Sequence, residues 1–135
     1  MGGYYGKGLP GKTKGLYASW VRRYGRCEYS NQATDNLNCA HILSRTFSRT
    51  HCDPRNTFCL SASQHAKFTQ NPLDFAAWVL QSEVGQYVDA MREKAYATRP
   101  KFDWYAEYDF VKYLSDNNIG LKDARENYEL YRSMI

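Results

Sequence analysis

Three side chains that can take part in acid–base or metal chemistry follow one another along the chain: His41, Asn56 and His65. A neutral imidazole can accept a proton from water near pH 7, and it can also bind a divalent cation. An asparagine between two histidines can hold an imidazole in place through hydrogen bonds. Side chains of these types can therefore activate water, alone or beside a bound cation.

The segments around His41 and Asn56 predict two short strands joined by an ordered loop. Residues 39–43 and 57–60 are short apolar runs that are typical of strands. The polar segment 44–56 between them contains Asp53-Pro54, which predicts a turn at the end of the loop. His41 is therefore expected on the first strand.

A helix is predicted to follow the second strand. Ser61 is a good N-cap for a helix that continues to residue 69, and His65 lies near its first turn. The expected order is strand, loop, strand and helix, with one histidine on the first strand and the other on the helix.

This order carries a resemblance to a known family. The chain reads C-x-H-x-x-S-R from Cys39, then D-P-x-N from Asp53, then a helix bearing His65. In these motifs it resembles the HNH nucleases, and more narrowly the phage-encoded NinG-like HNH proteins, most densely over residues 16–95. The resemblance implies an α+β fold with a small ββα-metal core at about residues 37–70. It also implies a metal-dependent DNA endonuclease, a phosphodiester hydrolase of phage origin, acting on branched or recombination DNA.

The resemblance also implies the roles of the three residues. His41 would be the general base, Asn56 would orient it, and His65 would ligate the divalent cation, Mg²⁺ or Mn²⁺. The family places an aspartate directly before the base histidine as a second ligand, and here that position is Ala40. Asp53 is the expected replacement, with His51, water or substrate phosphate as alternatives.

A second departure from the family concerns zinc. Many relatives hold a structural zinc with two C-x-x-C pairs, whereas the corresponding positions here are Cys27, Ser30, Ser61 and Gln64. Serine and glutamine are poor zinc ligands compared with thiolate, so no structural zinc is expected. The alternative is a zinc site that combines Cys27 with Cys39, Cys52 or Cys59.

Charge is distributed unevenly along the chain. Residues 1–67 contain ten Lys or Arg and three Asp or Glu, a balance of +7, and the remaining residues have a balance of −3. Such asymmetry favours a DNA-binding face, although a solvated basic surface without a partner would look the same. The residues expected to contact nucleic acid are Arg45, Arg49, Arg55, Lys67, Arg22 and Arg23.

Outside the core, residues 1–15 are expected to form a flexible, basic, Gly-rich arm, and residues 16–135 a single nuclease domain. A short helix is predicted at 16–24, and a helical extension covers 71–135. Its expected helices are 72–99, beginning at an Asn71 cap, then 104–116 and 121–134.

The composition is that of a globular protein, with 43% hydrophobic residues, 24% charged residues and a mean hydropathy of −0.70. No segment is long and apolar enough for a membrane span, and no secretory signal is visible, so a cytoplasmic location in a phage-infected bacterial host is expected, with reduced cysteines. The alternative function is a catalytically weak or inactive HNH-scaffold accessory protein that binds nucleic acid. A protein-interaction domain is a third hypothesis, and the sequence leaves the oligomeric state open.

Overall fold

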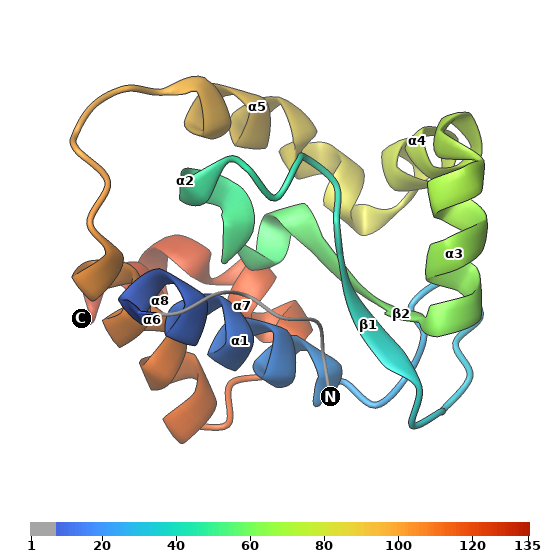
Figure 1. Ribbon diagram of the computed structural model, residues 1–135, viewed down its shortest axis with the longest axis horizontal. Helices are drawn as coiled ribbons and strands as arrows, with labels where there is room; N and C mark the ends of the chain where they lie inside the picture. Colours follow the sequence, from blue (N-terminus) through green and yellow to red (C-terminus); the bar gives the residue numbers. More distant parts are fainter. Residues whose placement is uncertain (1–7) are drawn as a thin grey trace.

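The computed structural model describes residues 8–135, a mainly helical α+β arrangement around one two-stranded sheet (Figure 1). The strands are β1 (Leu37–His41) and β2 (Thr57–Ser61). The α-helices are α1 (Gly8–Arg22), α2 (Ser48–His51), α3 (Ala62–Gln70), α4 (Pro72–Gln81), α5 (Val88–Tyr96), α6 (Trp104–Asp116), α7 (Leu121–Glu126) and α8 (Tyr128–Ser133). Two 3₁₀ helices complete the fold, η1 (Pro54–Asn56) and η2 (Glu83–Tyr87).

The two strands pair antiparallel, with His41 opposite Thr57 and Leu37 opposite Ser61. Both predicted strands and the helix after them are confirmed, although the first strand begins earlier and ends at His41, so residues 42 and 43 belong to the loop. The Ser61 cap is also confirmed, because its hydroxyl accepts a hydrogen bond from the Gln64 amide at 3.2 Å. This cap fixes the start of α3 and hence the place of His65.

The N-terminal helix is longer than the sequence predicts. Residues 8–15, expected to belong to a flexible arm, form the first half of α1, and residues 1–7 lie outside the described part of the chain. The reason is packing against α6: Gly11 and Thr13 are buried, and the Lys14 ammonium lies 5.4 Å from the centre of the Trp104 ring. Tertiary contact thus overrides the low helix propensity of a Gly-rich segment.

The helix predicted at 72–99 is three elements, α4, η2 and α5. The Ser82 hydroxyl donates to the Val79 carbonyl at 2.6 Å where α4 ends. A Cβ on Gly85 would lie 2.7 Å from the Leu80 carbonyl oxygen, so this close approach needs glycine. Asn71 does not cap α4 with its side chain, which donates instead to the Lys67 carbonyl at the end of α3.

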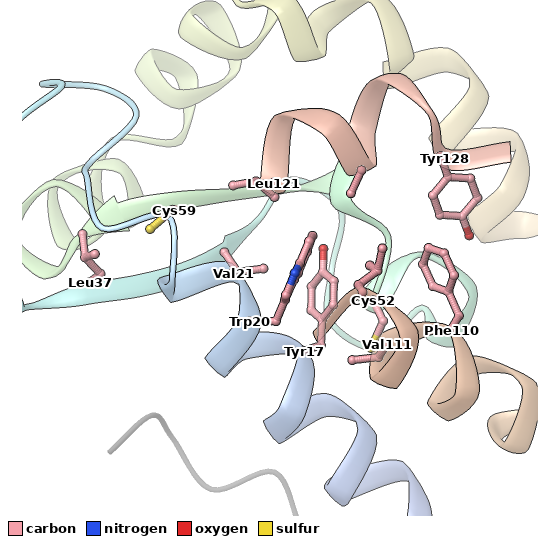
Figure 2. Packing of buried hydrophobic residues seen from close by; sticks show 12 residues of the cluster. Tyr17, Trp20, Val21, Leu37, Cys52, Cys59, Phe110, Val111, Leu121 and Tyr128 are labelled. Atoms are coloured by element: carbon pink, nitrogen blue, oxygen red, sulfur yellow. The ribbon is translucent and has the colours of Figure 1, made fainter. Parts of the chain in front are cut away.

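The sheet has a hydrophobic cluster on each face, because successive strand residues point to opposite sides. On one face Leu37 and Cys59 pack with residues from α1, α6, α7 and α8, including Tyr17 and Phe110 (Figure 2). On the other face the buried cluster holds Cys27, Ala40, Phe58, Leu60, Phe68, Val79 and Val84. All four cysteines are free thiols.

A buried arginine joins the C-terminal helices to the sheet. The Arg125 side chain is 2% exposed and donates to both carboxylate oxygens of Glu28, at 2.6 and 2.8 Å. It also donates to the carbonyls of Pro54 and Thr57 at 2.9 and 2.7 Å. Glu28 in turn accepts from the Cys59 amide of β2 at 2.9 Å. One side chain therefore fixes α7 against the segment that enters β2.

Candidate functional site

Two adjoining hollows meet at His41 and His65. The larger hollow has a volume of about 370 Å³, and Cys39, Ser44 and Arg45 also line it. The smaller, of about 220 Å³, lies towards α4. Both histidines line both hollows, so the structure brings together the two imidazoles that the sequence singles out.

His41 is the last residue of β1, and its tautomer follows from its hydrogen bond. The Nε2 atom lies 2.8 Å from the carbonyl oxygen of His51. A carbonyl oxygen only accepts, so Nε2 carries the proton and Nδ1 carries the lone pair. The buried Nδ1 atom has no hydrogen-bond partner among residues 8–135. Burial, followed by the nearby His51, lowers the pKa of His41 to about 3, which keeps the imidazole neutral.

Asn56 holds the loop that supports His41. Its buried side chain accepts from the Leu43 amide at 2.9 Å and donates to the Thr50 carbonyl at 3.0 Å. Its own carbonyl accepts from the Ile42 amide at 2.9 Å. Thr50 directly precedes His51, whose carbonyl accepts the hydrogen bond from His41 Nε2. Asn56 therefore positions His41 through the backbone of the loop rather than by direct contact.

His51 packs against His41 and helps to position it, which the sequence does not indicate. It is 2% exposed, its ring centre lies 4.4 Å from that of His41, and its Nδ1 donates to the Arg45 carbonyl at 3.2 Å. Burial lowers the pKa of His51 to about 4. The sequence suggests His51 only as an alternative metal ligand, because its contact with His41 depends on how the loop folds back.

His65 lies on α3, where its Nδ1 is 3.1 Å from the Asn38 side-chain nitrogen. Asn38 is on β1, opposite Leu60, and nothing in the sequence marks it as a site residue. Burial, followed by the charge of Arg45, lowers the pKa of His65. This ring is therefore held by a neighbour on the sheet. With the amide nitrogen donating to Nδ1, the proton of the neutral ring lies on Nε2; a flip of the Asn38 amide, which turns its oxygen towards Nδ1, moves the proton to Nδ1 and gives Nε2 the lone pair that a cation needs.

Asp53, expected at the metal, lies elsewhere. Its carboxylate is fully buried and ion-pairs with Arg55 at 2.8 Å and with Lys94 at 2.7 Å. Lys94 also donates to the Tyr128 hydroxyl at 2.7 Å, which ties this cluster to α5 and α8. Two cations therefore neutralise Asp53, and it lines neither of the two hollows.

Three of the six predicted DNA contacts have structural partners instead. Arg55 pairs with Asp53, as above, and Arg23 donates to the carbonyl and hydroxyl of Ser115 at 2.9 and 2.8 Å. Arg49 donates to the Pro100 carbonyl. The guanidinium groups of Arg23 and Arg49 thus join distant parts of the chain, and that of Arg55 is held beside Asp53.

The other three predicted contacts differ in position. Arg45 is exposed and lines the larger hollow. Arg22 is the last residue of α1 and lines neither hollow. Lys67 is exposed on α3 but lines a separate hollow beside Tyr29. Arg45 is thus the predicted cation best placed beside the histidines.

The positions that match the family's zinc ligands converge in space. The Cys27 thiol is hydrogen-bonded by side-chain and backbone groups of Ser30 and Ser61. Burial raises the pKa of Cys27, but these hydrogen bonds outweigh it and lower the value to about 7. Hydrogen bonds thus join the two segments at the place where the resemblance puts zinc.

Few side chains that could bind a metal gather around His65 in residues 8–135. Within residues 8–135 no group of three or more His, Cys, Asp or Glu side chains is arranged to hold a metal ion. His65 is the imidazole that lines the same two hollows as His41, and Mg²⁺ and Mn²⁺ commonly take their remaining ligands from water and phosphate. The residues present therefore fit a cation bound by one protein ligand together with substrate.

The lowered pKa values predict acid sensitivity of the fold. Unfolded histidines titrate near 6.5, whereas His41 and His51 have folded pKa values of about 3 and about 4. As the pH falls from about 6.5 towards 4, the unfolded chain binds protons that the folded chain does not, so stability is lost in this window. Two such groups give a slope of up to about 2.7 kcal/mol per pH unit, measurable by urea unfolding at about pH 7.5, 6 and 5.

Glu107 works in the opposite sense, because burial raises its pKa and the folded chain therefore holds its proton at higher pH than the unfolded chain. Its effect reduces the slope without reversing it. A free energy of unfolding that stays constant between about pH 7 and 5 would contradict the buried, neutral histidine pair.

Comparisons of this chain with protein-family models, with curated proteins and with solved structures found no match. None of the helices in residues 8–135 has the length and apolar character to span a membrane. The function proposed below therefore rests on the two hollows and the side chains that line them.

Proposed function

We propose that this protein is a metal-dependent DNA endonuclease with an HNH-type site formed by β1, β2 and α3. The observation that carries the proposal is that His41 and His65 line the same hollow. The Nε2 atom of His41 is hydrogen-bonded to the His51 carbonyl, and its Nδ1 lone pair has no partner among residues 8–135. A base for water activation needs such a lone pair on a positioned, neutral ring.

The chain's own groups suit phosphodiester hydrolysis. Once water reaches the buried Nδ1 of His41, this atom takes a proton from it as the water oxygen bonds to phosphorus. The bond from phosphorus to the deoxyribose oxygen breaks, and the departing oxygen takes a proton from solvent water. The His51 carbonyl holds the opposite side of the ring, which supports the imidazolium that forms. A divalent cation beside His65 would supply charge neutralisation at the phosphate oxygens.

The order of the secondary-structure elements and the hydrogen bonds between them give additional support. The strand, loop, strand and helix sequence, the Asn56 clamp on the loop and the convergence of Cys27, Ser30 and Ser61 all match what the resemblance to HNH proteins implies. These features are independent of the two histidines. They favour an HNH scaffold over an unrelated basic domain.

The second candidate is an accessory protein that binds nucleic acid on the same scaffold with little or no catalysis. The observation that favours it is that no carboxylate in residues 8–135 lines the hollows with His65: Ala40 occupies the family's aspartate position, and Asp53 is engaged by Arg55 and Lys94. Phage origin and action on branched DNA belong to the proposal through the resemblance.

Cleavage assays distinguish the two candidates. Supercoiled plasmid and a branched oligonucleotide are incubated with the protein and Mg²⁺ or Mn²⁺, with EDTA as the control. The nuclease proposal expects nicked or cut DNA with metal and intact DNA with EDTA. DNA that is bound yet uncut with every divalent ion would support the accessory protein instead.

Arg45→Ala is expected to weaken DNA binding in a salt-dependent way. If this exposed guanidinium contacts one phosphate, the log–log slope of affinity against salt should fall by about 0.9. Fluorescence anisotropy with a labelled duplex over a range of NaCl concentrations measures this slope.

Arg92→Ala is the matched control, since this arginine is 60% exposed on α5 and its guanidinium lies 3.9 Å from the Asp89 carboxylate. Its slope should equal that of the wild type. Equal slopes for Arg45→Ala and the wild type would mean that Arg45 makes no phosphate contact.

A further inference from the structure

The smaller of the two hollows differs in character from the larger one. Its volume is about 220 Å³, and besides the two histidines and Thr69 its lining is apolar: Ala40, Ile42, Phe68, Pro72 and Phe75. The larger hollow, of about 370 Å³, instead has Ser44 and Arg45 in its lining. The histidine pair therefore has a polar, cationic space on one side and an apolar, partly aromatic space on the other.

A nucleotide has one part that suits each of these two hollows. Its phosphate is anionic and suits a guanidinium, while its base has flat faces that stack on aromatic rings. If the phosphodiester to be cut lies at His41 and His65, the neighbouring phosphate can reach Arg45 and the neighbouring base can enter the apolar hollow. The two linings thus give the bound strand a direction across the site.

Phe75 is the ring best placed to receive a base. It is partly exposed on α4, whereas Phe68 beside it is only 7% exposed. The centres of the two rings are 5.0 Å apart, and Phe68 stacks at 5.4 Å on Trp78, so Phe75 is supported from behind by packed aromatic side chains. A preorganised ring loses little conformational freedom when a base stacks on it.

We propose that the hollow formed by Ala40, Ile42, Phe68, Pro72 and Phe75 binds the base of a nucleotide next to the cleaved phosphodiester, in an unpaired state. The proposal rests on the nuclease function proposed above and adds a substrate class. Both faces of a base inside an intact duplex are covered by its neighbours, so only a base freed from pairing can enter. The preferred substrates are therefore single strands, flaps and junctions with unpaired nucleotides rather than continuous duplex.

The test uses the wild-type protein without metal, so that binding is measured apart from cleavage. Fluorescence anisotropy in EDTA compares a short single-stranded oligonucleotide with a set in which one abasic nucleotide is moved through the sequence. Loss of the stacked base should weaken binding roughly five- to a hundredfold at one position or a small group of positions. In Mn²⁺ the same position should lie next to the cut.

Two variants test whether the loss of affinity for abasic strands arises in this hollow. Phe75→Leu should bind intact and abasic strands with nearly equal affinity, and Leu73→Ala, at an 85% exposed position on the same helix, should behave as the wild type does. Circular dichroism checks the fold of each, and the abasic series does not depend on either variant.

The outcomes are distinguishable from failure of the nuclease proposal. If plasmid is nicked but no abasic position weakens binding, the base-binding hollow is wrong and the nuclease remains. Equal affinities for intact duplex and for single strands would also contradict the proposal that the hollow binds an unpaired base. Protein that neither cuts nor binds any DNA overturns both proposals.

Discussion

His41→Ala is expected to slow DNA cleavage by about 10²–10⁴-fold, the usual contribution of a general base, while affinity for DNA measured in EDTA changes less than about twofold. The substitution removes the Nδ1 lone pair that no other group among residues 8–135 uses. It removes no positive charge, because the lowered pKa keeps His41 neutral. Single-turnover cleavage of an end-labelled oligonucleotide gives the rate.

The loss of the hydrogen bond to the His51 carbonyl is a separate effect and needs its own control. In His41→Gln the side-chain amide can still donate to that carbonyl but cannot act as a base, so it should be as inactive as His41→Ala and more stable. Thr46→Ala, at an exposed position in the same loop, should cleave normally. Wild-type rates in both His41 variants would exclude this residue as the base.

Arg125→Met should be the most destabilising single change outside the site, at about 3–5 kcal/mol. It leaves the Glu28 carboxylate with the Cys59 amide but without its cation, and it removes the Arg125 donor from the carbonyls of Pro54 and Thr57 in a buried region. For a domain of this size the loss corresponds to a drop in Tm of more than about 10 °C. Urea unfolding followed by circular dichroism measures it.

Two further variants test the cause. Lys122→Met removes a cation that is 54% exposed and lies 3.9 Å from Glu83, and it should cost less than about 0.5 kcal/mol. Adding Glu28→Gln to Arg125→Met should restore part of the stability, because no uncompensated charge then remains buried. A double variant less stable than Arg125→Met by the full effect of Glu28→Gln alone would mean that the two residues act independently.

The part of the site that could be predicted from the sequence depends on local signals. Ser61 accepts from the amide three residues later, so the start of α3 and the place of His65 follow from a few neighbouring residues. The short apolar runs similarly predict the strands that carry His41 and precede Asn56. The α+β class follows from these elements, while the HNH function remains a proposal.

The part that could not be predicted depends on distant partners. Asp53 looks available in the sequence, but Lys94, 41 residues later, neutralises it. Arg23 looks like a phosphate contact until α6 places Ser115 against it. The same applies to Asn38, whose proximity to His65 depends on the strand and the helix packing together. Charge patterns alone do not separate arginines that hold the fold from those that face solvent.

The distribution of the core also limits what can be done with this protein as a tool. Strands β1 and β2 form the whole described sheet of residues 8–135, and two strands alone are marginally stable in water. Their buried partners come from α1 at one end of the chain and from α6, α7 and α8 at the other. The segment with His41, Asn56 and His65 therefore does not carry its own core: a fusion of the proposed site to another domain must retain the helices on both sides of this segment.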